Sequence, residues 1–133
     1  MPQKLTLAIE RPGLAAVVRV EGTLDLRGAE HFDRELERLL AGRPSEVFID
    51  LHQVTFIDSI GLRSLYACYQ AGVHARVPLW FVRGGAVVTR MLRMTGLDAV
   101  LPLMDRIPRR LTGAGRAFTP PAVQGSEQLP ASP

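Results

Sequence analysis

The sequence predicts an α/β domain, with a small mixed β-sheet (mostly parallel, with an N-terminal hairpin) and helices packed on it. Short apolar runs typical of strands alternate with segments in which apolar residues recur at helical spacing. Only Pro12-Gly13 separates the first two strand-like runs, which favours an antiparallel hairpin. Helices separate the later strands, which favours parallel pairing through right-handed crossovers. A chain of 133 residues has room for one such domain.

The N-terminal elements follow from this spacing. A half-exposed first strand is predicted where three apolar residues alternate with polar or small neighbours: Leu5, Leu7 and Ile9. The run AAVVRVEG at 15–22 predicts the second strand. Four apolar residues then recur at i, i+4, i+7 and i+8, as on one face of a helix: Phe32, Leu36, Leu39 and Leu40. Gly42 and Pro44 supply the stop signal of that helix.

The remaining elements repeat the pattern. VFIDL at 47–51 predicts a central strand covered on both faces, and PLWFV at 78–82 predicts a further buried strand. Between them, a helix beginning at Ser59 is predicted by the spacing of Leu62, Leu65, Tyr66, Tyr69 and Val73. A helix opened by Gly84-Gly85 and ended by Gly96 would turn four residues inward: Val87, Val88, Met91 and Leu92. We expect a last extended piece at 99–101 and a short helix near Leu111.

Composition sets the limits of the domain and its surroundings. After about residue 111 the chain is rich in Gly, Pro, Ser, Ala and Gln, so we expect a domain at 3–111 and a disordered tail at 112–133. No apolar run approaches the roughly 20 residues of a membrane span, and the N-terminus lacks a signal-peptide pattern. We therefore expect a soluble, cytoplasmic protein. The net charge of +3, without interleaved aromatic residues, does not favour direct nucleic-acid binding.

The sequence offers no convincing catalytic set. Its three histidines lack ligand spacing and fall in predicted polar helix faces or loops, so neither a metal nor a cofactor is expected: His31, His52 and His74. The serine-hydrolase pattern G-x-S-x-G fails, because Ile57 replaces its first glycine. Gly84-Gly85 before a helix is a weak phosphate-binding signal. The single cysteine, Cys68, lies within a predicted helix and is expected to pack in the core.

Asp58 and Ser59 stand together where a strand gives way to a helix. Either residue can cap a helix N-terminus, so capping explains one of them but not both. Gly61 follows in the first turn, where glycine is unfavourable by up to about 1 kcal/mol relative to alanine. A position without a side chain would leave the backbone and the Ser59 hydroxyl open to a partner. From these residues alone, two interpretations stay open: simple helix capping, or a binding surface at this helix start.

Three segments together resemble the STAS domain of bacterial anti-sigma-factor antagonists. VFIDLHQVTFIDSIGLRSL at 47–65 is similar to the family's strand followed by an Asp-Ser-x-Gly-Leu motif. GTLDLRGAEHF at 22–32 is similar to its G-x-L-D segment, and GGAVVTRMLRMTGLDAVLPLMD at 84–105 is similar to its third helix and the stretch after that helix. The likeness covers the predicted domain and excludes the tail. It implies the family's mixed sheet with packed helices.

The resemblance implies a function that depends on partner switching. Ser59 matches the serine phosphorylated by a partner anti-sigma factor that is also an ATP-dependent kinase. The unphosphorylated antagonist binds that kinase and frees the sigma factor, the phosphorylated form lets go, and a serine phosphatase resets it. Transcription is regulated in this way without catalysis by the antagonist. Partner-binding positions implied by the resemblance, or next to the motif, are Gly22, Thr23, Leu24, Asp25, Asp58, Ile60, Gly61 and Arg63.

Several alternatives stay open at this point. Ile60 replaces a residue that is small in many family members, and its side chain narrows access to Ser59 or adds an apolar contact. Asp25 could serve only as a helix cap, and Arg63 could be a solvated side chain. The chain as a whole could be a STAS scaffold or transport-regulatory subunit without phosphorylation. A small nucleotide-binding protein that uses Gly84-Gly85 is a third possibility.

Overall fold

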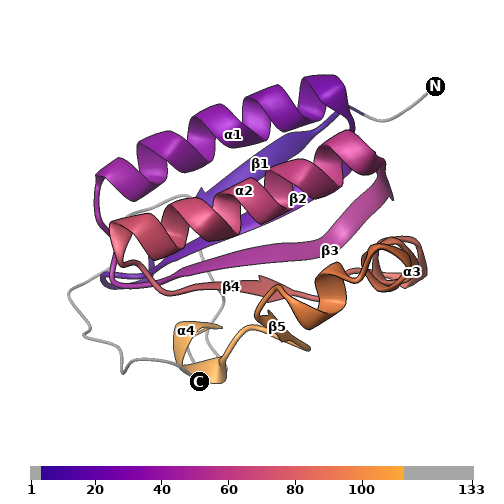
Figure 1. Cartoon of the computed structure of the whole chain (residues 1–133). Coiled ribbons are helices and arrows are strands. Elements are labelled where there is room, and N and C mark those ends of the chain that lie inside the picture. Colours follow the sequence, from indigo (N-terminus) through magenta and orange to yellow (C-terminus); the bar gives the residue numbers. More distant parts are fainter. Residues whose placement is uncertain (1–3, 113–133) are drawn as a thin grey trace.

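Figure 1 shows the computed structural model of the chain, which describes residues 4–112. Its strands form one five-stranded sheet in the spatial order β1-β2-β3-β4-β5. The strands are β1 (Thr6–Glu10), β2 (Ala16–Leu24), β3 (Val47–Ile57), β4 (Leu79–Val82) and β5 (Leu103–Met104). The helices are α1 (Leu26–Ala41), α2 (Ser59–Ala75), α3 (Ala86–Thr95) and α4 (Arg109–Thr112), with a 3-10 turn, η1, at Leu97–Ala99.

The pairing of the strands confirms the predicted mixed sheet. β1 and β2 form an antiparallel hairpin, and every later pair of neighbours is parallel. The parallel pairs are joined through α1, α2 and α3, as crossover connections require. This arrangement brings the C-terminal ends of β2 and β3 to one end of the sheet, where α1 and α2 begin (Figure 1).

The two long helices lie side by side on one face of the sheet (Figure 1). All four predicted inward residues of α1 are buried there, with alternate residues of the central strands: Phe32, Leu36, Leu39 and Leu40. Full burial of one such side chain stabilises the fold by about 1.5–3 kcal/mol. The buried face of α1 therefore holds this helix against the sheet. α1 ends at Gly42, as its stop signal predicts.

The opposite face of the sheet has a second, smaller core. Ile107 and Leu111 pack there against a cluster that includes Val17 and Phe48, so β3 is covered on both faces at its start, as predicted. A buried ion pair reinforces the contact, because Arg110 Nη1 donates to Glu46 Oε2 at 2.9 Å and Glu46 is only 2% exposed. The short helix expected near Leu111 is present as α4. The remainder of the predicted tail lies outside the described residues.

Two strands differ from the sequence-based expectation. β3 extends beyond the predicted 47–51 as far as Ile57, because β2 pairs with it up to Leu24. His52, expected on a helix face or in a loop, lies on this strand. The last strand is Leu103–Met104, not 99–101, because backbone pairing with β4 begins at Leu103 and the 3-10 turn η1 takes up the preceding residues.

The helices α2 and α3 bury narrower faces than their apolar spacing predicts. Tyr66 and Val73 are exposed, and α2 packs instead through a face rich in small residues: Gly61, Leu62, Ser64, Leu65, Cys68 and Gly72. In α3 the expected residues Val88 and Leu92 are buried, but Met91 is only half-buried and Val87 is 48% exposed. Both helices therefore keep apolar surface outside the core. Gly96, with φ of +80°, ends α3 as predicted.

No helix among residues 4–112 has the length and apolar character needed to cross a membrane.

Candidate functional site

Two adjacent parallel strands each end in an aspartate that begins a helix. Leu24 of β2 and Ile57 of β3 are paired in register, and the backbone N–H of Asp58 donates to Leu24 O at 3.5 Å. Asp25 follows Leu24 and is the N-cap of α1, and Asp58 follows Ile57 and is the N-cap of α2. The predicted site residues on the two loops are therefore brought together at one end of the sheet.

Asp58 carries out the capping of α2. Its Oδ1 accepts hydrogen bonds from the backbone N–H groups of Ile60 and Gly61, both at 3.0 Å. These are two of the four N–H groups that a helix start leaves without an intrahelical partner. Asp25 does the same for α1 with a single bond, accepted from Gly28 N at 3.1 Å.

Ser59 is the first residue of α2, and its side chain is exposed. Within residues 4–112 no group forms a hydrogen bond with its hydroxyl. Because Asp58 already caps the helix, the Ser59 hydroxyl is not needed to hold the fold together. These two neighbouring residues thus have different roles. Asp58 caps the helix, and Ser59 exposes its hydroxyl to solvent.

The packing of α2 explains why position 61 is a glycine, which the sequence did not reveal. Gly61 is buried, and a Cβ built on it would lie 2.1 Å from Leu24 O. Any side chain at this position would push α2 away from the end of β2. The expectation that this glycine opens access to Ser59 is therefore replaced by a packing role. Gly28 has the same role in α1, where a Cβ would lie 2.4 Å from Thr23 O.

The predicted partner-binding residues fall into two groups. Ser59 and Arg63 are exposed, and the remaining surface residues are half-buried: Asp25, Asp58 and Ile60. The other four predicted residues are buried, so they shape the site instead of lining its surface: Gly22, Thr23, Leu24 and Gly61. Their contribution to partner binding stays a prediction.

Sequence analysis missed two apolar residues at this end of the molecule. Leu26, the first residue of α1, is 55% exposed, and Phe56, next to the end of β3, is 49% exposed. Large apolar side chains held in solvent beside a polar site are typical of interaction surfaces. The alternation of β3 would have placed Phe56 on the side opposite the buried Ile57. That signal was lost because the predicted strand stopped at residue 51.

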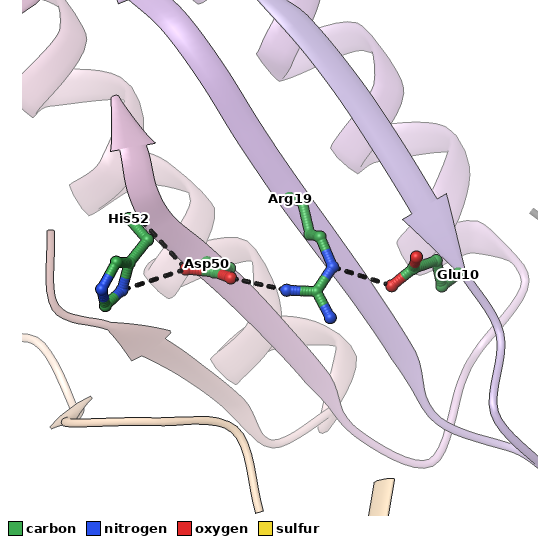
Figure 2. A network of polar contacts seen from close by, with 4 residues as sticks. All are labelled: Glu10, Arg19, Asp50 and His52. Carbon is green, nitrogen blue, oxygen red and sulfur yellow. Dashed lines mark hydrogen bonds and ion pairs between the residues drawn. The ribbon is translucent and has the colours of Figure 1, made fainter. Parts of the chain in front are cut away.

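A polar network crosses three strands on the sheet face away from α1 and α2 (Figure 2). Arg19 donates through Nε to Glu10 Oε1 at 3.0 Å and through Nη1 to Asp50 Oδ2 at 2.8 Å. Asp50 Oδ1 accepts from the backbone N–H of His52 at 3.0 Å, and the His52 ring Nδ1 lies 3.9 Å from the same oxygen. The two carboxylates are largely buried, so one guanidinium compensates both charges. The network therefore gives these charged side chains a structural role.

The remaining reactive groups do not form a chemical site. Burial raises the pKa of the Cys68 thiol, with a further contribution from the charge of Asp33, and a thiol kept protonated is a poor nucleophile. Within residues 4–112 no three His, Cys, Asp or Glu side chains gather closely enough to hold a metal ion. Gly84 has a packing reason, because a Cβ there would lie 2.7 Å from Leu51 O.

Known proteins resemble this chain in both sequence and structure. The sequence model of the STAS domain matches residues 6–109. The anti-sigma-F factor antagonist RsfB of Mycobacterium tuberculosis is 29% identical over 112 residues, which is 84% of this chain and 91% of that protein. The crystal structure of an anti-sigma factor antagonist from Mycobacterium paratuberculosis matches with a TM-score of 0.71 and 28% identity, over 83% of this chain and 93% of that one.

A more distant structure shows the same fold. The phosphorylated form of the Bacillus cell fate determinant SpoIIAA matches with a TM-score of 0.64 and 15% identity, over 84% of this chain and 100% of that one. The family match runs from β1 into α4. It therefore covers the five-stranded mixed sheet and both aspartate-capped helices. This chain belongs to the STAS domain family.

Proposed function

We propose that this chain is an anti-sigma-factor antagonist whose affinity for its partner is controlled by phosphorylation of Ser59. The observation that carries the proposal is the exposed hydroxyl of Ser59, which bonds to no residue of the described range 4–112 and directly follows a residue that already caps α2. The relatives named anti-sigma factor antagonists support the choice of partner. The protein acts by binding, without a cofactor or a reaction of its own.

Phosphorylation would change the surface more than the fold. A phosphoserine adds about 1.5–2 negative charges near neutral pH, and a helix N-terminus tolerates an anion. Ile60 N and Gly61 N are already bonded to Asp58, so the phosphate would stand next to a carboxylate and face outward. A partner surface fitted to a neutral hydroxyl would then meet a solvated dianion. Loss of about 3 kcal/mol of binding free energy lowers the affinity roughly 150-fold.

The proposed contact surface combines polar and apolar groups. Ser59 supplies its polar group, and three residues close in sequence to the two helix caps add exposed or half-buried apolar area: Leu26, Phe56 and Ile60. Arg63, one turn further along α2, is exposed and can pair with an acidic group of the partner. The partner is an anti-sigma factor that is also an ATP-dependent serine kinase, and a serine phosphatase restores the free hydroxyl. A regulator of transcription that uses ATP in this way would act in the cytoplasm, which is the location we propose.

A phosphorylation assay tests the proposal. The purified full chain is incubated with its cognate anti-sigma kinase and ATP, and the peptide containing Ser59 is examined by mass spectrometry. We expect one phosphate on wild type and on Thr6→Ala, a matched control that removes an exposed hydroxyl from β1. Ser59→Ala should remain unmodified. Binding of the kinase without phosphorylation of Ser59 would favour a STAS scaffold, and phosphorylation elsewhere would place the switch on another residue.

A further inference from the structure

The helices α1 and α2 leave a groove of about 520 Å³ between their C-terminal halves. Leu36 and Leu40 of α1 lie along it, together with the buried Cys68 of α2. Three alanines of α2 that recur every fourth residue also line it: Ala67, Ala71 and Ala75. A row of methyl groups at this spacing allows the backbone of another helix to approach closely.

The rim of this groove is acidic. Asp33 and Glu37 of α1 line it and are exposed, one turn apart. Neither forms a salt bridge with any residue of the described range 4–112. Arg43 stands at the end of the groove and is the only cation that lines it within that range. An apolar groove with an unneutralised acidic rim is complementary to a helix that carries both apolar and basic side chains.

The helix α3 has this composition. Its inner face is held by Val88 and Leu92, but Met94 is 69% exposed and Val87 is also largely in solvent. With the half-buried Met91, these residues recur at i, i+4 and i+7, so α3 carries an apolar stripe outside the core. The helix contains two arginines and no acidic residue.

The two arginines of α3 lie where they could meet an acidic rim. Arg90 lies next to the apolar stripe on the helix surface, and Arg93 lies further round on the same side, so that only long side chains such as these could reach a rim beside the stripe. Neither arginine is buried. Neither forms an ion pair with any residue between 4 and 112. Figure 1 shows α3 at the end of the sheet where α1 and α2 begin, whereas the groove lies along their C-terminal halves. A molecule therefore cannot place its own α3 in its own groove.

We infer that α3 of one copy docks in the α1–α2 groove of a second copy. Val87, Met91 and Met94 would lie on the alanine row, and Arg90 and Arg93 would pair with Asp33 and Glu37. Because the two contact surfaces differ and lie at different ends of the molecule, the contact is head-to-tail and can repeat along a chain of copies. This association goes beyond the proposed function and does not require the Ser59 switch.

The strength of the contact should be modest. A helix of ten residues covers less than the roughly 800 Å² per partner of a standard interface, so we expect a dissociation constant on the order of 0.1 mM. The charged rim should make the association weaker as the salt concentration rises, because exposed ion pairs are screened.

Charge reversal in the full chain tests the inference. Sedimentation equilibrium of wild type should show an average mass that rises with concentration. Arg90→Glu/Arg93→Glu and Asp33→Lys/Glu37→Lys should each reduce self-association at least tenfold. Lys4→Glu/Arg27→Glu, which changes the net charge as much as the first pair but lies on neither surface, should associate as wild type does, and so should Ser59→Ala.

Mixing the two variants gives the sharpest result. The acidic α3 of one variant fits the basic groove of the other, so an equimolar mixture should recover the association that each variant lacks alone. Circular dichroism of each variant checks that its fold is unchanged. The inference is overturned if wild type remains monomeric up to about 1 mM, because a dissociation constant of about 1 mM would already give substantial association at that concentration. It is equally overturned if the mixture stays monomeric or if neither reversal reduces self-association.

Discussion

The starts of α1 and α2 are built in the same way, but differ at one position. Each follows a parallel strand, begins with an aspartate cap, and has a glycine three residues later whose Cβ would collide with a strand carbonyl: Asp25 and Gly28 in α1, Asp58 and Gly61 in α2. The residue after the cap is Leu26 in α1 and Ser59 in α2, and both are exposed. The position after the cap therefore tolerates different side chains and leaves them accessible to a partner.

The largest expected effect comes from the glycines that the two helix starts share. Gly61→Ala should lower the free energy of unfolding by about 3 kcal/mol, because its Cβ meets a backbone carbonyl that cannot move without disturbing β2. Gly28→Ala should behave similarly. Gly85→Ala is the matched control, since nothing lies within 4 Å of its Cβ. Urea unfolding measures all three, and a loss below about 1 kcal/mol for Gly61→Ala would contradict the packing role.

The capping aspartates should come next, with a difference between them. Asp58→Ala removes two hydrogen bonds and should cost about 2 kcal/mol of unfolding free energy, whereas Asp25→Ala removes one and should cost about 1 kcal/mol. Asp98→Ala is the control, because Asp98 is exposed and caps no helix through its side chain. Thermal or urea unfolding gives the order, and a larger loss for Asp25 than for Asp58 would reverse the comparison.

A charge-only change separates capping from partner binding at Asp25. Asn caps helices about as well as Asp, so Asp25→Asn should leave the unfolding free energy within about 0.5 kcal/mol of wild type. If the carboxylate faces the partner, affinity for the cognate anti-sigma kinase should fall about tenfold, which corresponds to roughly 1.4 kcal/mol. Titration calorimetry measures this change. Unchanged affinity would leave Asp25 with a capping role alone.

The smallest effect on stability should come from Ser59 itself. Ser59→Ala removes a hydroxyl that bonds to no residue in the range 4–112, and alanine favours the helix. The free energy of unfolding should change by less than about 0.5 kcal/mol, as it should for Leu26→Ala at the equivalent position. A loss of about 1 kcal/mol or more, which is the usual cost of losing a cap, would mean that the Ser59 hydroxyl shares in capping.

Local patterns predicted the order and type of most elements. The i, i+4, i+7, i+8 spacing placed α1 and its four buried residues, and the short Pro12-Gly13 turn predicted the hairpin. Errors arose where tertiary contacts override local pattern. α2 turned Tyr66 outward because small residues let it approach the sheet, and β3 continued to Ile57 because β2 supplied backbone partners.

The motif located the candidate site, but the roles of its residues depend on contacts between segments that are distant in the sequence. Sequence could not decide whether Asp58 or Ser59 caps α2, because either side chain can accept the same N–H groups. The carbonyl that excludes a side chain at Gly61 belongs to Leu24, on another strand, and no local pattern joins the two. The network of Glu10, Arg19 and Asp50 was missed for the same reason, since its members come from three strands.

The most direct test is the partner affinity of two Ser59 variants, measured by calorimetry with the cognate anti-sigma kinase and nucleotide present. Ser59→Ala should bind as tightly as the unphosphorylated wild type. Ser59→Asp, with about half the charge of a phosphate, should bind at least tenfold more weakly, although an acid at a helix N-terminus leaves it equally stable or more so. Equal affinity of the two variants would contradict a phosphorylation switch at Ser59.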